Sequence, residues 1–226
     1  MTAHSAFATR TAEAALYTLY YFPGNASLMP HMLLRELGVP FELYKVDRAS
    51  NEQKSPEYLK LNPSGHIPVL VDDGRAIFET AAITLYLADR HIDKGLAPAF
   101  GAPERGDYYK WMVLLTNALQ TQYRAWFYAH EFVEDPANVD SVKAATASRI
   151  GATFTQLSAH LATSTWLLGE RISAPDLYLF MFIRWGRALP HPPRLDPILA
   201  AFAERVASRP AVRAALDAEG IAPPFI

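Results

Sequence analysis

The sequence predicts an α/β domain in the first half of the chain and an all-α domain in the second half. Two observations support this division. Strand-like and helix-like segments alternate up to His91, whereas from Glu104 onward apolar residues recur only at the three- and four-residue steps of helices. Between the two patterns, residues 93 to 103 contain two glycines and two prolines, so we expect a linker there. The chain of 226 residues is long enough for two small domains.

The first domain is expected to cover residues 16–92, after a loose tail at residues 1–15 that is rich in Ala and Thr. Its elements follow the order strand, helix, strand, strand, strand, helix, with a further helix or turn in the polar stretch 47–56. The opening strand–helix–strand unit implies a parallel pair, and Asp73-Gly74 suits the turn of a hairpin. This order is that of a thioredoxin-like domain. The expected bounds are 16–22, 28–37, 42–46, 69–71, 76–78 and 80–91.

The second domain, residues 104–226, is expected to contain only helices. Its first helix carries a buried apolar stripe, and Pro136 interrupts the chain after it. Ser173 and Asp176 are spaced as a capping box in front of a segment that is apolar almost all round, so that helix should lie at the centre of the domain. The stripe consists of Tyr108, Met112, Leu115, Leu119, Tyr123 and Trp126. The later helices are expected at 139–161, 177–189, 197–208 and 211–219.

The composition excludes several classes of function. A formal net charge of −2, a pI near 6.4 and scattered Lys and Arg residues indicate that neither nucleic acid nor an anionic membrane is a partner. The chain has no cysteine, and its histidines lack metal-ligand spacing, so we expect no disulfide and no metal cofactor. The longest apolar run, 177–183, is too short to span a bilayer, and residues 1–15 lack the apolar core of a signal peptide. We therefore expect a cytoplasmic protein whose thiol chemistry, if any, uses a thiol supplied by the substrate.

Two short motifs in the first domain are suited to binding a small peptide. The segment from Asn62 to Leu70 contains turn-forming pairs and places Pro68 directly in front of a strand, where it cannot donate to a sheet. If the bond before Pro68 is cis, Ile67 presents an unpaired edge with which an extended peptide can pair. Glu79-Thr80 follows the next strand and opens a helix, whose free N-terminus suits an acid while the carboxylate suits an amine.

These residues resemble the glutathione transferase family. Asn62 to Leu70 matches its Asn-Pro-x-Gly-x-x-Pro-x-Leu element, and Glu79-Thr80 its glutathione-clamping Glu-Ser/Thr pair. The segment from Leu19 to His31 is similar to the opening of the bacterial beta class, except that Ala26 stands at the position of the beta-class cysteine. The resemblance implies the glutathione transferase architecture, glutathione as co-substrate, small apolar electrophiles as acceptors, and a homodimer.

The resemblance also implies a residue that stabilises the glutathione thiolate at the start of the first helix. Ser27 is the first candidate, because it precedes Leu28, where backbone N–H groups and the helix dipole favour an anion. Its alternative role is a plain helix cap. Tyr21, at the end of the first strand, is the second candidate, although a buried strand also requires large residues. Asn25 could reach the sulfur with its amide.

Further site residues follow from the same resemblance. Ile67 and Pro68 are expected to hold the cysteinyl backbone of glutathione, and Glu79 and Thr80 its γ-glutamyl end. At the glycine end, His66 is the candidate, with Lys54 a possible cation. On the long helix of the second domain, Thr116, Gln120, Tyr123 and Phe127 share one face, which should look across the cleft. The expected apolar wall for the electrophile consists of Met29, Tyr123 and Phe127.

Two other functions use the same fold and stay open at this stage. A glutathione-dependent peroxidase or disulfide reductase would employ the same thiolate, and a non-catalytic protein could bind apolar ligands or partners. Fold alone does not decide among them. Turnover does: conjugation of a chlorinated nitrobenzene, reduction of a hydroperoxide, or neither.

Overall fold

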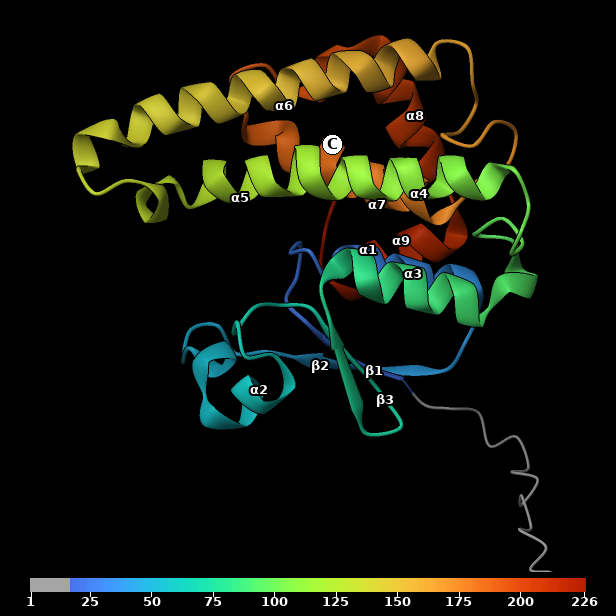
Figure 1. The fold of residues 1–226 in the computed structure, drawn as a ribbon, viewed down its shortest axis with the longest axis horizontal. Coiled ribbons are helices and arrows are strands. Elements are labelled where there is room, and N and C mark those ends of the chain that lie inside the picture. Colours follow the sequence, from blue (N-terminus) through green and yellow to red (C-terminus); the bar gives the residue numbers. More distant parts are fainter. Residues whose placement is uncertain (1–16) are drawn as a thin grey trace, which may run out of the picture.

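The computed structural model describes residues 17 to 226 and contains the two expected domains (Figure 1). The expected tail at residues 1–15 lies outside the described residues. The first domain is built on a sheet of order β2-β1-β3-β4. Strands β1 (Tyr17–Tyr21) and β2 (Phe41–Lys45) are parallel, whereas β3 (Val69–Asp72) is antiparallel to β1 and to β4 (Arg75–Phe78). The thioredoxin-like α/β prediction is therefore confirmed.

Helices cover both faces of this sheet. Helices α1 (Leu28–Leu37) and α3 (Thr80–Arg90) lie on the face toward the second domain, and α2 (Pro56–Leu61) lies away from it (Figure 1). The alternation along β1 explains the two layers, because successive side chains of a strand point to opposite faces. Three residues of β1 enter the main core, and Tyr20 packs on the other side. The main-core residues are Tyr17, Leu19 and Tyr21, and Tyr20 joins Val46, Tyr58 and Val69.

The second domain is helical throughout. Its long first helix consists of α4 (Glu104–Leu114), a π-helical segment (Leu115–Gln120) and α5 (Thr121–Phe127). It is followed by α6 (Val139–Leu161), α7 (Ala174–Trp185), α8 (Pro197–Ala207) and α9 (Pro210–Ala218). Short 3-10 segments cover Glu52–Lys54, Ile92–Lys94, Ala129–Phe132, Pro136–Asn138, Gly186–Ala188 and Pro193–Leu195. Within residues 17–226, no helix combines the length and apolar character needed to cross a membrane.

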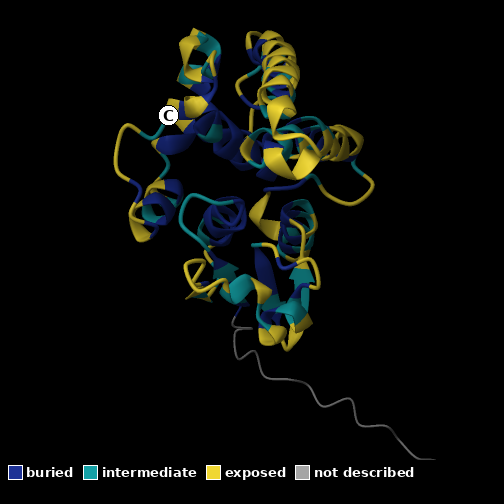
Figure 2. Cartoon of the chain, turned by 90° about the vertical axis from the view of Figure 1, so that its left-hand side faces the viewer, coloured by how far each residue is buried: buried dark blue, intermediate teal, exposed yellow. Residues whose placement is uncertain are grey.

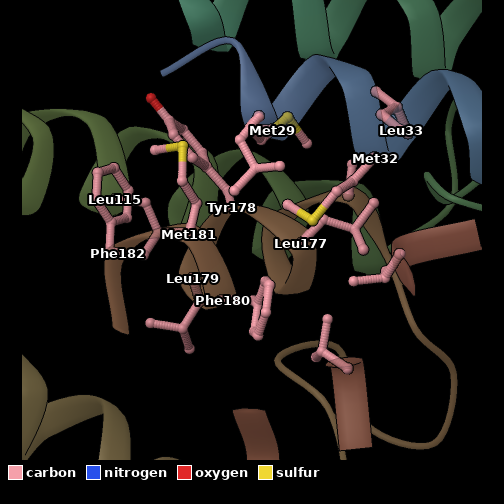
Figure 3. Close-up of a cluster of buried hydrophobic side chains, with 14 of the residues drawn as sticks. Met29, Met32, Leu33, Leu115, Leu177, Tyr178, Leu179, Phe180, Met181 and Phe182 are labelled. Atoms are coloured by element: carbon pink, nitrogen blue, oxygen red, sulfur yellow. The ribbon is translucent and has the colours of Figure 1, made fainter. Parts of the chain in front are cut away.

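Helix α7 is the centre of the helical domain, as its apolar sequence predicts. Every residue from Ala174 to Arg184 is buried, and the burial-coloured view shows dark blue where the two domains meet (Figure 2). Met29, Met32 and Leu33 of α1 face Leu177 and its neighbours on α7 (Figure 3). One apolar core therefore runs through both domains, so α1 is packed against the sheet on one side and against α7 on the other.

The cap of α7 explains why this helix begins earlier than the apolar pattern suggests. Ser173 and Asp176 form the predicted capping box, so the first turn starts at Ala174 instead of Leu177. The Asp176 carboxylate accepts the backbone N–H of Ser173 at 2.7 Å and that of Leu167 at 2.8 Å. Complete burial raises the pKa of Asp176 to about 6, while these donors oppose the shift. At its other end, the helix passes into the 3-10 segment Gly186–Ala188.

Candidate active site

A cleft of about 650 Å³ lies between the two domains, within the usual range of small-ligand sites. The first domain contributes the loop between β1 and α1, the turn before β3 and the start of α3. The helical domain contributes one face of the α4–α5 helix and the residues that follow α7. Both motifs that the sequence suggested for binding a peptide therefore line one cavity, the first through His66, Ile67 and Pro68 and the second through Glu79 and Thr80.

The turn before β3 is held in shape by hydrogen bonds to its backbone. The Ile67–Pro68 bond is cis, as the motif suggested. The carbonyl of His66 accepts hydrogen bonds from the Tyr58 hydroxyl and the Asn62 amide, both at 2.8 Å. Gly65 has a φ of 61°, and a Cβ there would lie 2.7 Å from the Gln53 carbonyl, so only glycine fits.

The second motif carries backbone strain and unpaired polar atoms. Glu79 has a φ of 72°, a conformation that costs a non-glycine residue about 1–3 kcal/mol and that clusters at ligand sites. Thr80 is buried, and its hydroxyl oxygen has no hydrogen-bond partner within residues 17–226. The Oε1 atom of Gln53, another cleft residue, is likewise buried and unpaired in the described part of the chain. Because buried polar atoms are nearly always paired, these atoms are candidate ligand contacts.

The loop between β1 and α1 is held by the helical domain. The N–H of Gly24 donates to Oε2 of Glu219 at 2.7 Å, and its carbonyl accepts from the Trp185 indole at 3.0 Å. Oε1 of Glu219 lies 2.8 Å from Nδ1 of His31, and both side chains are fully buried. Sequence reasoning did not find this contact, because Glu219 and Gly24 are 195 residues apart.

The structure does not bring Ser27 or Tyr21 into the cleft. Ser27 is completely buried, and its hydroxyl donates to the Phe22 carbonyl at 3.1 Å while accepting the Phe22 N–H. Tyr21 belongs to the main core, where burial, and then the charge of Glu219, raise its pKa. Neither residue lines the cleft, whereas Asn25 and Ala26 do. The side-chain oxygen Oδ1 of Asn25 accepts the Ala26 N–H at 2.6 Å, which leaves the side-chain NH₂ of Asn25 as a donor at the cleft wall.

Two of the three expected electrophile-wall residues also lie in the core. The Met29 sulfur accepts a hydrogen bond from Thr84 at 2.7 Å, and the Tyr123 hydroxyl donates to the Phe182 carbonyl at 2.9 Å. Phe127 does line the cleft, as does Gln120, whose side-chain oxygen accepts from the Tyr178 hydroxyl.

Tyr123 follows the buried stripe and not the cleft face. The sequence placed it in both sets, because each set advances in steps of three and four residues. The structure buries Tyr123 completely, and the cleft face of this helix includes Thr116, Gln120, Arg124, Phe127 and Tyr128.

The cleft contains further residues that sequence reasoning missed. Four are cationic or aromatic side chains that come from three separate parts of the chain, and no local motif marks them: Phe22, Arg48, Trp185 and Arg187. His66, also at the cleft, has a lowered pKa because of burial and the nearby cations Arg124 and Lys54. Its imidazole is therefore neutral at pH 7.

Comparisons with known proteins agree with this geometry. The family model of the glutathione S-transferase N-terminal domain matches residues 26–90, and that of the C-terminal domain matches residues 118–210. A glutathione S-transferase of Xanthomonas campestris pv. campestris, GST-4.5, is 34% identical over 90% of this chain and 98% of its own length.

Solved structures give the same result. A sphingomonad glutathione S-transferase complexed with glutathione is 36% identical, with 91% of this chain and 100% of that chain covered and a TM-score of 0.79. The bacterial beta class enzyme of Sphingomonas chungbukensis is 33% identical, with the same coverage and a TM-score of 0.80. The class of protein that the two domains and their cleft define is thus the glutathione S-transferases. This chain belongs to that family.

The buried carboxylate of Glu219 should be important for stability. We expect Glu219→Gln to lower the free energy of unfolding by about 1–3 kcal/mol. The glutamine side chain has one oxygen and one NH₂ group, so either the Gly24 N–H or the His31 ring would face a donor instead of an oxygen. Urea denaturation measures this, and hydrogen exchange of the loop peptide should become faster. Glu204→Gln, an exposed acid on α8, is the control and should change stability little. Equal effects of the two substitutions would contradict the expectation.

Proposed function

We propose that this chain conjugates reduced glutathione to small electrophiles with an apolar body. The observation that supports the proposal most is the meeting of three elements in one cleft: the cis Ile67–Pro68 turn, the Glu79-Thr80 pair and the loop that leads into α1. Glutathione is an extended tripeptide with an amino acid at one end, and each element suits one part of it.

The proposed pose uses the polar groups that the site leaves available. The cysteinyl backbone pairs with the main chain of Ile67, as in strand addition. The γ-glutamyl carboxylate accepts from the Thr80 hydroxyl and the free N–H groups of the first turn of α3, and Glu79 binds the ammonium group. The glycyl carboxylate lies toward Lys54, whose ammonium donates to the Ser64 carbonyl at 2.9 Å beside the turn.

In the proposed reaction the thiol first releases its proton to solvent. The thiolate sulfur then forms a bond to the acceptor carbon, and the leaving group departs with the electrons of its own bond. A free thiol has a pKa near ~8.5, so lowering it by about two units requires roughly 2.7 kcal/mol of thiolate stabilisation. Because the Ser27 hydroxyl is bonded to the Phe22 backbone and neither Ser27 nor Tyr21 lines the cleft, we assign this role to the Asn25 amide and to the helix dipole of α1.

Glutathione binding is the first test. We expect wild type to bind reduced glutathione in calorimetry. Glu79→Ala should raise the dissociation constant about 10- to 150-fold, since a charge-assisted hydrogen bond is worth about 1.5–3 kcal/mol. Glu42→Ala, an exposed acid on β2, is the control and should bind like wild type. Wild type that releases no heat at millimolar glutathione would contradict the proposal.

The thiolate donor is the second test. The pKa of bound glutathione can be read from the ultraviolet absorbance of the thiolate. Asn25→Ala should raise that pKa by about one to two units, whereas Ser27→Ala and Tyr21→Phe should shift it less. A larger shift in Ser27→Ala would return the role to that hydroxyl, and a larger shift in Tyr21→Phe would give it to the phenol.

We also propose a homodimer in which the first domain of one subunit contacts the helical domain of the other. Exposed apolar side chains on both domains support it, with Phe78 at 38% exposure on β4 and Val113 at 57% on α4. Such reciprocal contacts produce twofold symmetry. Sedimentation should give twice the chain mass of 25.1 kDa, and Val113→Glu should shift the protein toward the monomer. Phe132→Glu, an equally exposed control at 52%, should not; a monomeric wild type at micromolar concentration contradicts this proposal.

A further inference from the structure

The cleft is more positive than the protein as a whole. The residues that line it include four permanent cations, Arg48, Lys54, Arg124 and Arg187, against the two carboxylates of Glu79 and Glu131. The entire chain has a formal net charge of −2. Cations gathered in a cleft raise the local concentration of anionic ligands.

Two of these cations are already accounted for. Lys54 lies beside the turn that receives the glycine end of glutathione, and its ammonium donates to the Ser64 carbonyl. Arg124 pairs with Glu131 at 2.5 Å. Glu79 is assigned to the ammonium group of glutathione. The surplus positive charge therefore belongs to Arg48 and Arg187.

Arg48 and Arg187 have no carboxylate partner within residues 17–226. The Arg48 guanidinium lies 5.1 Å from the centre of the Phe22 ring, and its nearest polar contact is the Tyr128 hydroxyl at 3.5 Å. Arg187 donates to the Arg184 carbonyl at 2.8 Å. Burial, and then the charge of Arg187, lower the pKa of Arg184 to about 10, so the charged neighbour of Arg187 is another arginine and not an acid. Both side chains are exposed, with donors left over for a ligand.

Aromatic surfaces lie beside these guanidinium groups. Phe22 stacks under Arg48, and Trp185 is two residues from Arg187 and meets Phe127 edge-on at 5.9 Å. Phe127 is 44% exposed and lines the cleft. A planar acceptor could pack on these rings while an anionic group on it reaches an arginine, which binds carboxylates through two parallel hydrogen bonds.

We propose that the acceptor substrate is an aromatic or unsaturated carboxylate, whose charged group is bound by Arg48 and Arg187. This inference rests on the proposed function and narrows its acceptor from any apolar electrophile to one with a negative charge. With a chloroaromatic acid, the sulfur–carbon bond forms as the carbon–chlorine bond breaks, chloride leaves with the electron pair, and the thiol proton goes to solvent. The carboxylate takes no part in this exchange and serves only for binding.

The test compares two glutathione conjugates made chemically in advance. One carries a dinitrophenyl ring with a carboxylate opposite the sulfur, and the other carries the uncharged carboxamide at the same place. Glutathione, ring and shape are shared, so the ratio of their dissociation constants reports the carboxylate alone. Binding of the conjugates does not depend on turnover. We expect the carboxylate to bind about five- to tenfold more tightly, between the effect of an exposed ion pair and that of a buried charged hydrogen bond.

Three variants locate the effect. Arg48→Met and Arg187→Met keep the apolar stem of each side chain and remove the charge. Each should reduce the preference for the carboxylate, and the double variant should abolish it without changing the affinity for the carboxamide. Arg149→Met removes the same charge from an exposed position on α6 and should leave the preference intact. Added salt should reduce the preference in wild type, because exposed charges are screened.

The outcomes separate this inference from the proposed function. If wild type does not bind glutathione itself, the proposed function fails. If it binds glutathione but holds the two conjugates equally tightly, or holds neither more tightly than glutathione, the carboxylate inference alone is overturned. It is also overturned if the arginine variants weaken glutathione and both conjugates by the same factor, because the guanidinium groups would then bind glutathione.

Discussion

The buried carboxylate of Glu219 is the interaction on which the arrangement of the site depends. It joins α9, at the end of the chain, to Gly24 and His31 near its beginning. A buried carboxylate is costly unless its oxygens are paired, and here each oxygen has a partner. The indole of Trp185 holds the Gly24 carbonyl, so both backbone groups of this residue are bound by the helical domain. The loop that carries Asn25 and Ala26 is therefore held both by its own hydrogen bonds and by contacts from the helical domain.

The packing of α1 extends the same constraint. Its apolar residues face α7, and Glu36 near its end accepts two hydrogen bonds from Arg209 at 2.6 and 2.8 Å. A bidentate pair of this kind fixes orientation as well as distance. Helix α1 is thus held along its length by elements from the other domain.

The two walls of the cleft differ in chemistry. The first domain offers backbone groups, the strained Glu79 and the unpaired hydroxyl of Thr80, which suit a polar ligand of defined shape. The helical domain offers Phe127, Trp185 and Arg187, and the first domain adds Phe22 and Arg48; these aromatic and cationic side chains suit a planar body and a charge. The polar groups of the two motifs and this second set of side chains are different residues, so one set can change without replacing the other.

The sequence by itself determined the fold and the half of the site that local motifs encode. The spacing of apolar residues and the positions of glycine and proline predicted the helices and strands, and α1 and α6 begin and end where the pattern predicts. Ile67, Pro68, Glu79 and Thr80 belong to turns whose chemistry is read from neighbouring residues. Only the tertiary structure decided which side chains reach the cleft. Ser27 turns toward the Phe22 backbone, Tyr123 donates to the Phe182 carbonyl in the core, and Arg48 and Arg187 line one cleft from different domains. A periodic pattern specifies that a residue is buried or exposed, but its partners in space are set by packing between segments distant along the chain.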